Sequence, residues 1–316
     1  MKTHRISIVI PVKNGASTLG QCLDGLSTQK TEIPPEIIVI DSGSTDGSVE
    51  LVKNYPVKLI QIPSDQFNHG FTRNLGATEA TGDLVFFTVQ DAWTTDNELL
   101  ERMAEHFKDP EVMGVCGQQI VPHDVDKNPV AWFRSYSEPV PRKYQYLASE
   151  YQDLPPNQKA FVGGWDDVVA MYRRAYLLEH PFEHTNFSED LKWANHTLAD
   201  GKALIFDYRN RVNHYHHEDF SYRYRRQFIE DCQRYWIFGM QASPLYRSFS
   251  SIRKLLSVYF KVPFGARWWV YNIRLIIADL LAGIQVRFHA LMNAKKLIKK
   301  YQQLTHEVPQ GKQYGS

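Results

Sequence analysis

The chain has 316 residues, of which 43% are hydrophobic and 22% charged, and a formal net charge of +1. This composition is typical of a soluble globular protein with one large domain or two of ordinary size, and it excludes a fibrous or low-complexity chain. Three widely spaced cysteines form neither a CxxC pair nor a disulfide framework, which favours a reducing compartment.

Apolar strands alternate with amphipathic helices along the first hundred residues. The alternation predicts βαβ units, and therefore an α/β fold with a mostly parallel sheet. The predicted strands are residues 6–10, 36–40, 57–60 and 84–88, and the predicted helices are residues 17–26, 44–53 and 71–80.

The next hundred residues continue this pattern with one interruption. Residues 122–160 are rich in Pro, Tyr and charge, so we predict a long irregular excursion, which in a compact domain is usually functional or mobile. From residue 219 to about 300 the pattern is helical. We therefore expect two domains, residues 1–215 and 216–316. Around the excursion we predict strands at 112–121, 168–172 and 203–207, and helices at 96–107 and 189–199.

Polar residues gather where the predicted strands end. In parallel sheets, ligands bind beyond the carboxyl ends of the strands. Each residue taken alone is equally typical of a turn, since Asn, Asp, Ser and Pro are favoured there. Their coincidence on three strands favours a binding site. These residues are Pro11, Asn14, Asp41, Ser42 and Asp91.

Four segments, in order and with suitable spacing, resemble the family 2 glycosyltransferases. They are Ile8–Asn14, Ile38–Gly47, the Arg-Asn-x-Gly-Ala segment Thr72–Ala77, and Phe187–Ala194 with its Glu-Asp pair. The resemblance spans roughly residues 5–215. It implies a GT-A fold and an inverting transfer of a sugar from a nucleotide donor.

A finer resemblance concerns two further segments. Phe67–Asn74, together with Gln90-Asp91-Ala92, is similar to bacterial rhamnosyltransferases. This implies dTDP-L-rhamnose as the donor and a role in building surface polysaccharides. It also implies that His69 and Gln90 lie near the donor, although a His before a Gly is equally suited to stabilising a turn.

The metal motif departs from that of the family. The usual Asp-x-Asp reads Val89-Gln90-Asp91, so one carboxylate of two is kept. The resemblance implies that Asp91 binds the metal and that the lost position would contact the ribose. Mg²⁺ or Mn²⁺ would neutralise the charge that grows on a diphosphate leaving group. Arg73, near a helix N-terminus, would add a bidentate fork at the phosphates, unless it forms a surface ion pair.

Asp190 is the predicted general base. Inversion requires a carboxylate that takes the proton of the acceptor hydroxyl as it attacks the anomeric carbon. Ser188 is a predicted N-cap, which puts Glu189 and Asp190 in the first helical turn. Acids are favoured there by the helix dipole whatever the function, and we expect Glu189 to bind acceptor.

Five further candidates remain, most of them with open alternatives. His214 and His216 would share one face of an extended segment and can complete the metal site, hydrogen-bond phosphate or acceptor, or form an exposed loop cluster. Trp165, with Asp166 beside it at the acceptor site, would stack on a sugar, or else be a core residue. Asp41 would accept from the N3–H of thymine or uracil, or form an Asx-turn.

The charge is unevenly distributed along the chain. Residues 251–316 hold eleven Lys or Arg against two acids, a net of +9, which leaves −8 for residues 1–250. Residues 268–288 are strongly apolar but contain Arg274 and Asp279, so we predict no membrane span. An interfacial amphipathic helix fits better, with attachment to an anionic membrane surface, and the alternative is a homo-oligomer contact. We expect a cytoplasmic protein, peripheral on the inner face of the cell membrane, acting on a saccharide or polyprenyl-linked acceptor.

Rival functions remain at this stage. A glycosyltransferase using a UDP- or GDP-sugar is one, and a non-catalytic carbohydrate- or membrane-binding scaffold is another, which Val89 keeps open. A processive polysaccharide synthase would need Gln-x-x-Arg-Trp, and a dehydrogenase would need GxGxxG, and the chain has neither. No recognised motif supports nucleic-acid binding.

Overall fold

The structure is a computed structural model that describes residues 4–133, 140–185 and 187–305. The chain divides into two compact units. The first comprises the described residues of Met1–Ile120, Tyr136–Leu154 and Phe161–Tyr215, and the second those of Val121–Ser135, Pro155–Ala160 and His216–Ser316. The main break follows Tyr215, but two short segments from the earlier part of the chain belong to the second unit.

A nine-stranded sheet forms the centre of the first unit, in the order β3-β2-β1-β4-β8-β6-β9-β5, with β7 paired to β9 outside this path. Strands β1 to β4, β6 and β9 run in one direction, and β5, β7 and β8 run in the other. The sheet is therefore mixed but mostly parallel, as predicted. The strands are β1 (Ile6–Val12), β2 (Glu36–Asp41), β3 (Lys58–Gln61), β4 (Leu84–Phe87), β5 (Trp93–Thr94), β6 (Val112–Ile120), β7 (Arg142–Tyr144), β8 (Ala170–Arg173) and β9 (Ala203–Asn213).

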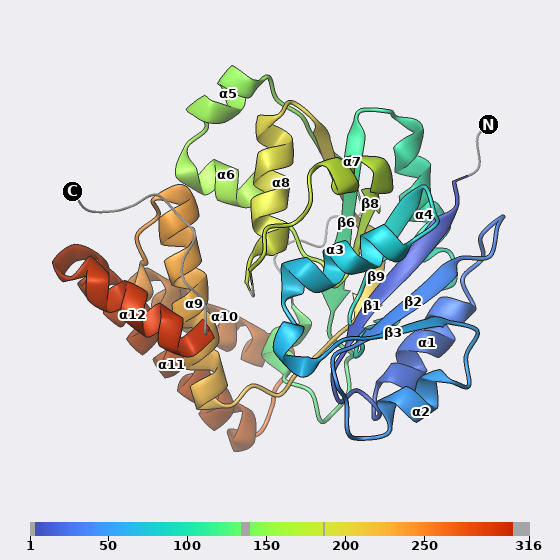
Figure 1. The fold of residues 1–316 in the computed structure, drawn as a ribbon. Helices are drawn as coiled ribbons and strands as arrows, with labels where there is room; N and C mark the ends of the chain where they lie inside the picture. Colours follow the sequence, from blue (N-terminus) through green and yellow to red (C-terminus); the bar gives the residue numbers. More distant parts are fainter. Residues whose placement is uncertain (1–3, 134–139, 186, 306–316) are drawn as a thin grey trace. The chain divides into compact units, whose positions relative to one another are not determined.

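Helices cover both faces of this sheet (Figure 1). Because neighbouring side chains of a strand point to opposite faces, β1 serves two cores. Ile8 and Ile10 pack with α1 and α4 on one face, and Val9 packs on the other with α3 and α8. The helices are α1 (Leu19–Ser27), α2 (Ser48–Val52), α3 (His69–Glu79), α4 (Leu99–Ala104), α5 (Ala148–Asp153), α6 (Pro156–Val162), α7 (Arg174–Glu179) and α8 (Glu189–Ala199).

Part of the predicted irregular excursion has regular structure. Within residues 122–160, the described residues form the 3₁₀ helix η3 (Pro129–Trp132), β7, α5 and most of α6. These elements are short, so too few residues repeat for a period to be visible in the sequence. Prolines lie at their boundaries: Pro129 and Pro156 each open a helix, where a missing N–H costs nothing.

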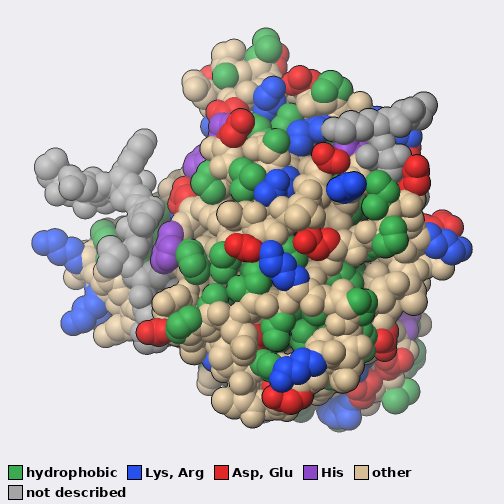
Figure 2. All heavy atoms as spheres, turned by 45° about the vertical axis from the view of Figure 1, so that its right-hand side comes forward, with side chains coloured by type: hydrophobic (Ala, Val, Ile, Leu, Met, Phe, Trp, Pro, Cys, Tyr) green, Lys and Arg blue, Asp and Glu red, His purple; other side chains and the backbone are tan. Residues whose placement is uncertain are grey.

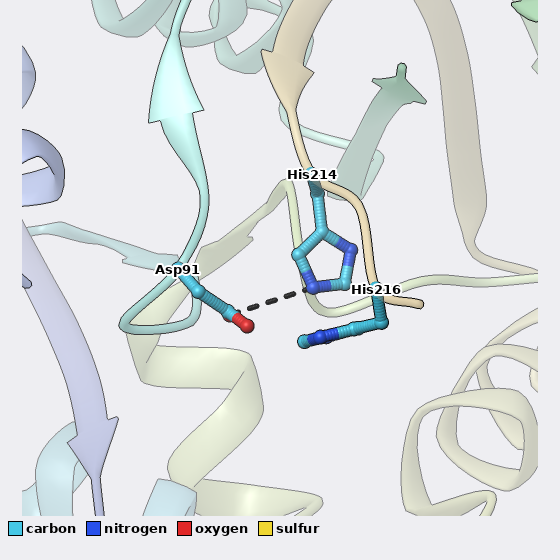
Figure 3. Close-up of side chains that lie close together, drawn as sticks. All are labelled: Asp91, His214 and His216. Carbon is cyan, nitrogen blue, oxygen red and sulfur yellow. Dashed lines mark ion pairs between the residues drawn. The ribbon is translucent and has the colours of Figure 1, made fainter. Parts of the chain in front are cut away.

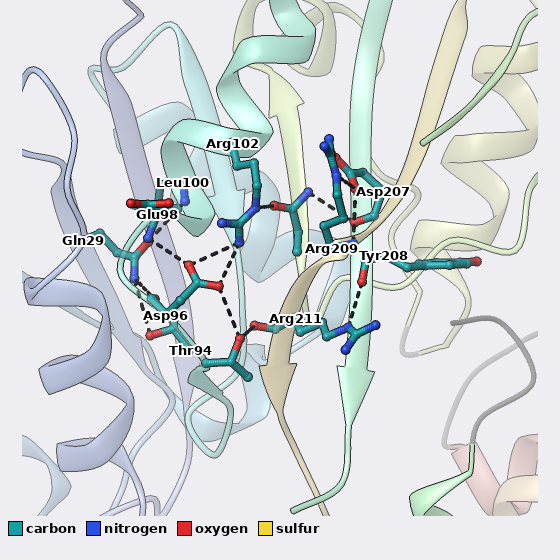
Figure 4. Close-up of polar contacts among 12 residues, drawn as sticks. Gln29, Thr94, Asp96, Glu98, Leu100, Arg102, Asp207, Tyr208, Arg209 and Arg211 are labelled. Carbon is teal, nitrogen blue, oxygen red and sulfur yellow. Dashed lines mark hydrogen bonds and ion pairs between the residues drawn. The ribbon is translucent and has the colours of Figure 1, made fainter. Parts of the chain in front are cut away.

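β9 is longer than predicted because its pairing with β6 has a break. Cys116 pairs with Phe206, and the next pair is Gln118 with Arg211. The three extra residues of β9 are held by a polar network (Figure 4). Asp207 accepts hydrogen bonds from the Arg209 side chain, and Arg102 donates from Nε to Asn210 Oδ1 at 2.9 Å. Burial raises the pKa of Asp207, but hydrogen bonds from Arg209 and His106 outweigh it, so the pKa is lowered. Arg102 also pairs with Asp96 at 2.9 Å, so this network contains two Arg–Asp ion pairs.

The second unit is built on four helices: α9 (Phe220–Phe238), α10 (Pro244–Lys261), α11 (Ala266–Met292) and α12 (Ala294–Thr305). Asp219 caps α9 by accepting from the backbone of Tyr222 at 2.8 Å. A buried ion pair joins α9 to α11, with Arg223 donating to both carboxylate oxygens of Asp279. In the described part of the chain, α11 alone is long and apolar enough to cross a membrane, and a third of its most apolar window is buried. A buried core helix has the same length and composition.

Candidate active site

Side chains that follow two strands lie together and offer ligand atoms for a metal ion. We call Asp91, His214 and His216 the metal-type site. Asp91 lies in the turn after β4, and His214 directly follows β9 (Figure 3). His214 Nε2 lies 3.4 Å from Asp91 Oδ1. With His216, two residues further along the chain, they offer three ligand atoms that all lie within 4.8 Å of one another. One carboxylate and two imidazoles are a donor set that suits a divalent cation such as Mn²⁺.

Gln119, at the end of β6, orients His214. Its Oε1 lies 2.7 Å from His214 Nδ1 and can accept only from an N–H there, which leaves Nε2 as the ring nitrogen that faces Asp91. The other end of the amide donates from Nε2 to Asp166. This arrangement resembles the hydrogen bonds that fix metal-bound histidines in proteins. The sequence analysis missed Gln119, whose signal is its place at the carboxyl end of the strand beside β9.

The loops after β1 and β2 are tied to each other by polar residues of the predicted site. Asp41 is 1% exposed and accepts from the backbone N–H groups of Gly43 and Ser44, so it forms the Asx-turn alternative. Ser42 donates from Oγ to the Val12 carbonyl at 3.0 Å. Asn14 has a positive φ of 50° and accepts from the backbone of Thr45. In this conformation their polar atoms bind protein backbone.

Pro11 and Gln90 have structural contacts in the same region. Pro11 lies in β1 opposite Ile40 of β2. The Gln90 amide accepts from the backbone N–H of Lys13 at 2.8 Å and donates to its carbonyl at 3.0 Å. The pair of bonds closes the β1 loop over the turn that carries Asp91. Gln90 therefore positions the metal-type site from its flank.

Arg73 lies in the interior of the first unit. Its side chain is 6% exposed and forms ion pairs with Asp167 at 3.0 Å and with Glu189. Burial disfavours the guanidinium charge, but Asp167 and Glu189 outweigh it, and the pKa of Arg73 is raised. The Arg73 guanidinium was expected to bind the phosphates. In this conformation it binds protein carboxylates, because a buried guanidinium must be paired. Glu189 was expected to bind acceptor. It is 5% exposed and forms an ion pair with Arg73 in this conformation.

Asp190 belongs to the same acidic group. Its Oδ1 accepts from the backbone of Leu191 at 2.7 Å, and Oδ2 accepts from the backbone of Asp167 at 3.4 Å. Burial raises the pKa of Asp190 well above its usual value, and the charges of Glu189 and Asp167 raise it further. A carboxyl group with a raised pKa is a stronger base once ionised, which suits a general base. We call Asp166, Asp167, Glu189 and Asp190, with Arg73 among them, the acidic cluster.

The helix that carries Asp190 begins as predicted but without the predicted side-chain cap. Ser188 is the N-cap residue, has a positive φ of 63°, and makes no capping hydrogen bond through its side chain. Strain of this kind in a non-glycine residue persists only where its surroundings impose it. It directs the first turn of α8, with both acids, into the cluster.

Trp165 is a core residue and not an exposed stacking platform. It is 5% exposed, packs against Phe206 and Trp193, and donates from Nε1 to Tyr172 Oη at 2.6 Å. Tyr172 in turn donates to Asp167. Burial is the main reason that the pKa of Asp167 is raised to about 7. Tyr172 was not predicted as part of the site, since a buried Tyr in a strand is typical of an ordinary core.

His69 opens α3 beside the acidic cluster. Its Nδ1 lies 3.4 Å from Arg73 Nη1, and its ring packs edge-on against Phe67. Burial lowers its pKa. The ring therefore packs beside Arg73 in this conformation, four residues along the same helix.

Comparison with known proteins identifies the family. The family model described as glycosyl transferase family 2 matches residues 7–176. The O-antigen chain rhamnosyltransferase RfbN of Salmonella typhimurium (strain LT2) is 31% identical over 244 residues, covering 75% of this chain and 72% of that protein. The O-antigen chain rhamnosyltransferase WbaN of Salmonella anatum is 29% identical over 241 residues, covering 74% and 71%.

The fold has solved counterparts as well. Mannosyltransferase PcManGT from Pyrobaculum calidifontis, in complex with GDP-Man and Mn²⁺, matches with a TM-score of 0.55 at 16% identity, over 96% of this chain and 85% of that one. The strand order, the helices on both faces and the site at the strand ends define an α/β enzyme of the GT-A class. The chain belongs to glycosyltransferase family 2, and it is a glycosyltransferase.

Proposed function

We propose that the enzyme transfers L-rhamnose, with inversion, from dTDP-L-rhamnose to a saccharide or polyprenyl-linked acceptor in the synthesis of a bacterial surface polysaccharide. One observation carries the proposal. A chain of contacts connects the metal-type site to the predicted base, from His214 through Gln119 to Asp166, and from its neighbour Asp167 to Asp190. The rhamnosyl donor is supported by the two relatives named O-antigen chain rhamnosyltransferases.

A divalent cation fits the residues present. Asp91, His214 and His216 would hold it, and a bound cation would supply charge neutralisation at the diphosphate leaving group. Imidazole ligands favour Mn²⁺ over Mg²⁺, since Mg²⁺ prefers oxygen ligands and retained water. In this proposal the Arg73 guanidinium pairs with Asp167 and Glu189, and the cation takes the role at the phosphates.

Asp190 and Asp166 are the residues proposed to act on the acceptor. Asp190 accepts the proton of the attacking hydroxyl, and Leu191 N–H fixes its Oδ1 for that purpose. Burial raises the pKa of Asp190, and the Arg73 charge opposes part of that rise. Asp166, half-buried and bonded to Gln119, lies beside the base and is the proposed acceptor contact.

We propose a cytoplasmic location on the inner face of the cell membrane, where a polyprenyl-linked acceptor would be present. A UDP- or GDP-sugar is the alternative donor, and the mannosyltransferase solved with GDP-Man is the observation that favours it. A non-catalytic scaffold would bind ligand without releasing nucleotide.

Donor screening by thermal shift tests the proposal. Purified protein is heated with dTDP-L-rhamnose, UDP-GlcNAc or GDP-mannose, each with Mn²⁺, with Mg²⁺ or with EDTA. The expected result is the largest rise in Tm with dTDP-L-rhamnose and Mn²⁺, because a ligand that binds only the folded state stabilises it. Asp91→Asn serves as the matched variant and should abolish the contribution of the metal.

Slow hydrolysis of the donor separates the remaining alternatives. Release of dTDP by the native protein, and its loss in Asp190→Asn, is expected for the proposed enzyme. A rise in Tm only with UDP- or GDP-sugars would overturn the rhamnosyl donor. Binding without any nucleotide release, with or without added acceptor saccharides, would favour the scaffold.

A further inference from the structure

Exposed apolar side chains concentrate on two helices of the second unit. Among the described residues, 21 large hydrophobic side chains are exposed, and 14 of them lie on α10 and α11. On α11 they recur every three or four residues, which places them on one side of the helix. The stripe consists of Val270, Ile273, Ile277, Leu281, Ile284, Phe288 and Leu291.

α10 carries a second stripe of the same kind, and the two helices pack against each other. Tyr259 of α10 contacts Trp269 of α11, with ring centroids 5.2 Å apart. Among its members, Phe260 is 81% exposed, Leu245 74% and Phe249 69%. The stripe on α10 consists of Leu245, Phe249, Ile252, Leu256 and Phe260. We call the two stripes together the α10–α11 face.

The opposite side of α11 is fixed within the unit. Asp279 is 5% exposed and paired with Arg223 of α9, and Asn272 exchanges hydrogen bonds with Asn128 at 2.9 and 3.0 Å. If α11 crossed a bilayer as a separate helix, these groups would lose their partners in a medium that offers none. Its packing is therefore that of a helix lying on a surface, with one side in the protein core.

The α10–α11 face could bind a lipid surface or a second copy of the chain, and the charge of the two helices favours the lipid surface. α10 and α11 hold seven Lys or Arg and a single acid, the buried Asp279. Six of the cations are exposed: Arg253, Lys254, Lys261, Arg267, Arg274 and Arg287. A second copy docking through the same face would bring these like charges together, because a twofold contact pairs a patch with itself. An anionic lipid surface attracts them.

Other parts of the molecule are less suited to a lipid surface. On the face drawn in Figure 2, acidic and basic side chains are interspersed, and neither sign forms a large patch. The basic helix α12 uses part of its charge internally, since Lys300 donates to Tyr224 and Gln285. Among the described residues, α10 and α11 combine continuous apolar stripes with six exposed cations.

We propose that the α10–α11 face lies on an anionic lipid bilayer, with its apolar side chains in the headgroup–acyl boundary and its cations among the lipid phosphates. The inference rests on the proposed membrane location and identifies the surface responsible for it. It does not depend on the identity of the donor. Apolar burial and attraction to anionic lipid add in such interfacial helices, so both kinds of side chain contribute.

Co-sedimentation with vesicles tests this contact. Vesicles of phosphatidylcholine alone are compared with vesicles in which part of the lipid is phosphatidylglycerol, at low and high salt. The native protein should bind the anionic vesicles, and salt should weaken the binding. Phe249→Glu with Phe260→Glu should weaken it at least about tenfold, since each buried aromatic side chain contributes roughly that factor. Arg274→Gln with Arg287→Gln should reduce the preference for anionic lipid, by about fivefold per charge.

Leu147→Glu is the matched control, because Leu147 is 68% exposed but lies on the first unit. Its vesicle binding should equal that of the native chain. Each variant is also checked for Tm and for stabilisation by nucleotide sugar. A vesicle defect with normal donor stabilisation concerns the face alone, and failure of donor binding in the native chain concerns the proposed function alone.

Three results would overturn the inference. The first is native protein that ignores anionic vesicles. The second is a stable dimer in sedimentation analysis that Phe249→Glu with Phe260→Glu converts to a monomer, which would assign the face to a second copy. The third is membrane association in cells that resists alkaline carbonate, which would indicate a spanning α11.

Discussion

The acidic cluster and the metal-type site differ in how their charges are balanced. In the acidic cluster, one buried guanidinium is shared between Asp167 and Glu189. In the metal-type site, one carboxylate faces two imidazoles, which carry no permanent charge. The first group is an internal ion pair that shapes a base. The second offers three ligand atoms close together, and we propose that a divalent ion binds there.

The largest expected effect separates the two groups by function. Asp190→Asn should reduce kcat by up to about 10⁴-fold, the upper range for loss of a general base, because the amide cannot take the acceptor proton. Donor and metal stabilisation in thermal shift should be unchanged. Asp200→Asn, at the other end of α8, is the control. Near-normal turnover in Asp190→Asn would remove the residue from this role.

The second largest expected effect is a loss of stability when Arg73 is replaced. Arg73→Met leaves Asp167 and Glu189 buried without their cation, and should cost about 3–5 kcal/mol in the free energy of unfolding, measured by urea denaturation. A double change to Arg73→Met with Glu189→Gln should recover part of it. Normal stability combined with a large rise in KM for the donor would contradict the internal ion pair and restore Arg73 to the phosphates.

Replacing Gln119 tests metal binding without changing any of the three proposed ligands. Gln119→Leu removes the acceptor that fixes the His214 tautomer, and should weaken Mn²⁺ binding about 10- to 100-fold in calorimetry with dTDP present. Gln66→Leu, at an exposed position in the 3₁₀ helix Ser64–Gln66, is the control. Unchanged Mn²⁺ affinity together with loss of turnover would assign Gln119 to the acceptor side.

The pH dependence gives the smallest effect. The pKa of Asp190 is raised, so its ionised form is lost at a higher pH than for an ordinary aspartate. Below that midpoint kcat should fall about tenfold per pH unit, and the midpoint should lie well above pH 4. The midpoint belongs to the coupled cluster and should move when Asp166→Asn removes one neighbouring charge. A flat rate from pH 4 to pH 8 would contradict a titrating base.

The α/β fold could be predicted because its signals are local. Strand periods, turn residues and the order of motifs are all visible within short windows, and the sheet and α8 agree with them. The metal-type trio was predicted too, from one carboxylate at a strand end and two histidines at spacing two. Its geometry in the structure is consistent with that prediction.

The internal use of Arg73 was not predictable in the same way. Its partners Asp167 and Glu189 are 94 and 116 residues away, so no window contains the pair. Trp165 shows the same limit, because exposure depends on which distant side chains cover a residue. The short helices in residues 122–160 were missed for another reason, since each is too brief for its period to register.

The three extra residues in β9 change the phase of that strand. Before them, odd-numbered side chains such as Ala203 and Ile205 point into the core beneath α1 and α4, and after them the even-numbered Val212 does. Because the number of extra residues in β9 is odd, they reverse the face of the sheet to which His214 points. Deleting one residue from 207–210 would leave the sequence of the site intact and turn the imidazole to the opposite face of the sheet.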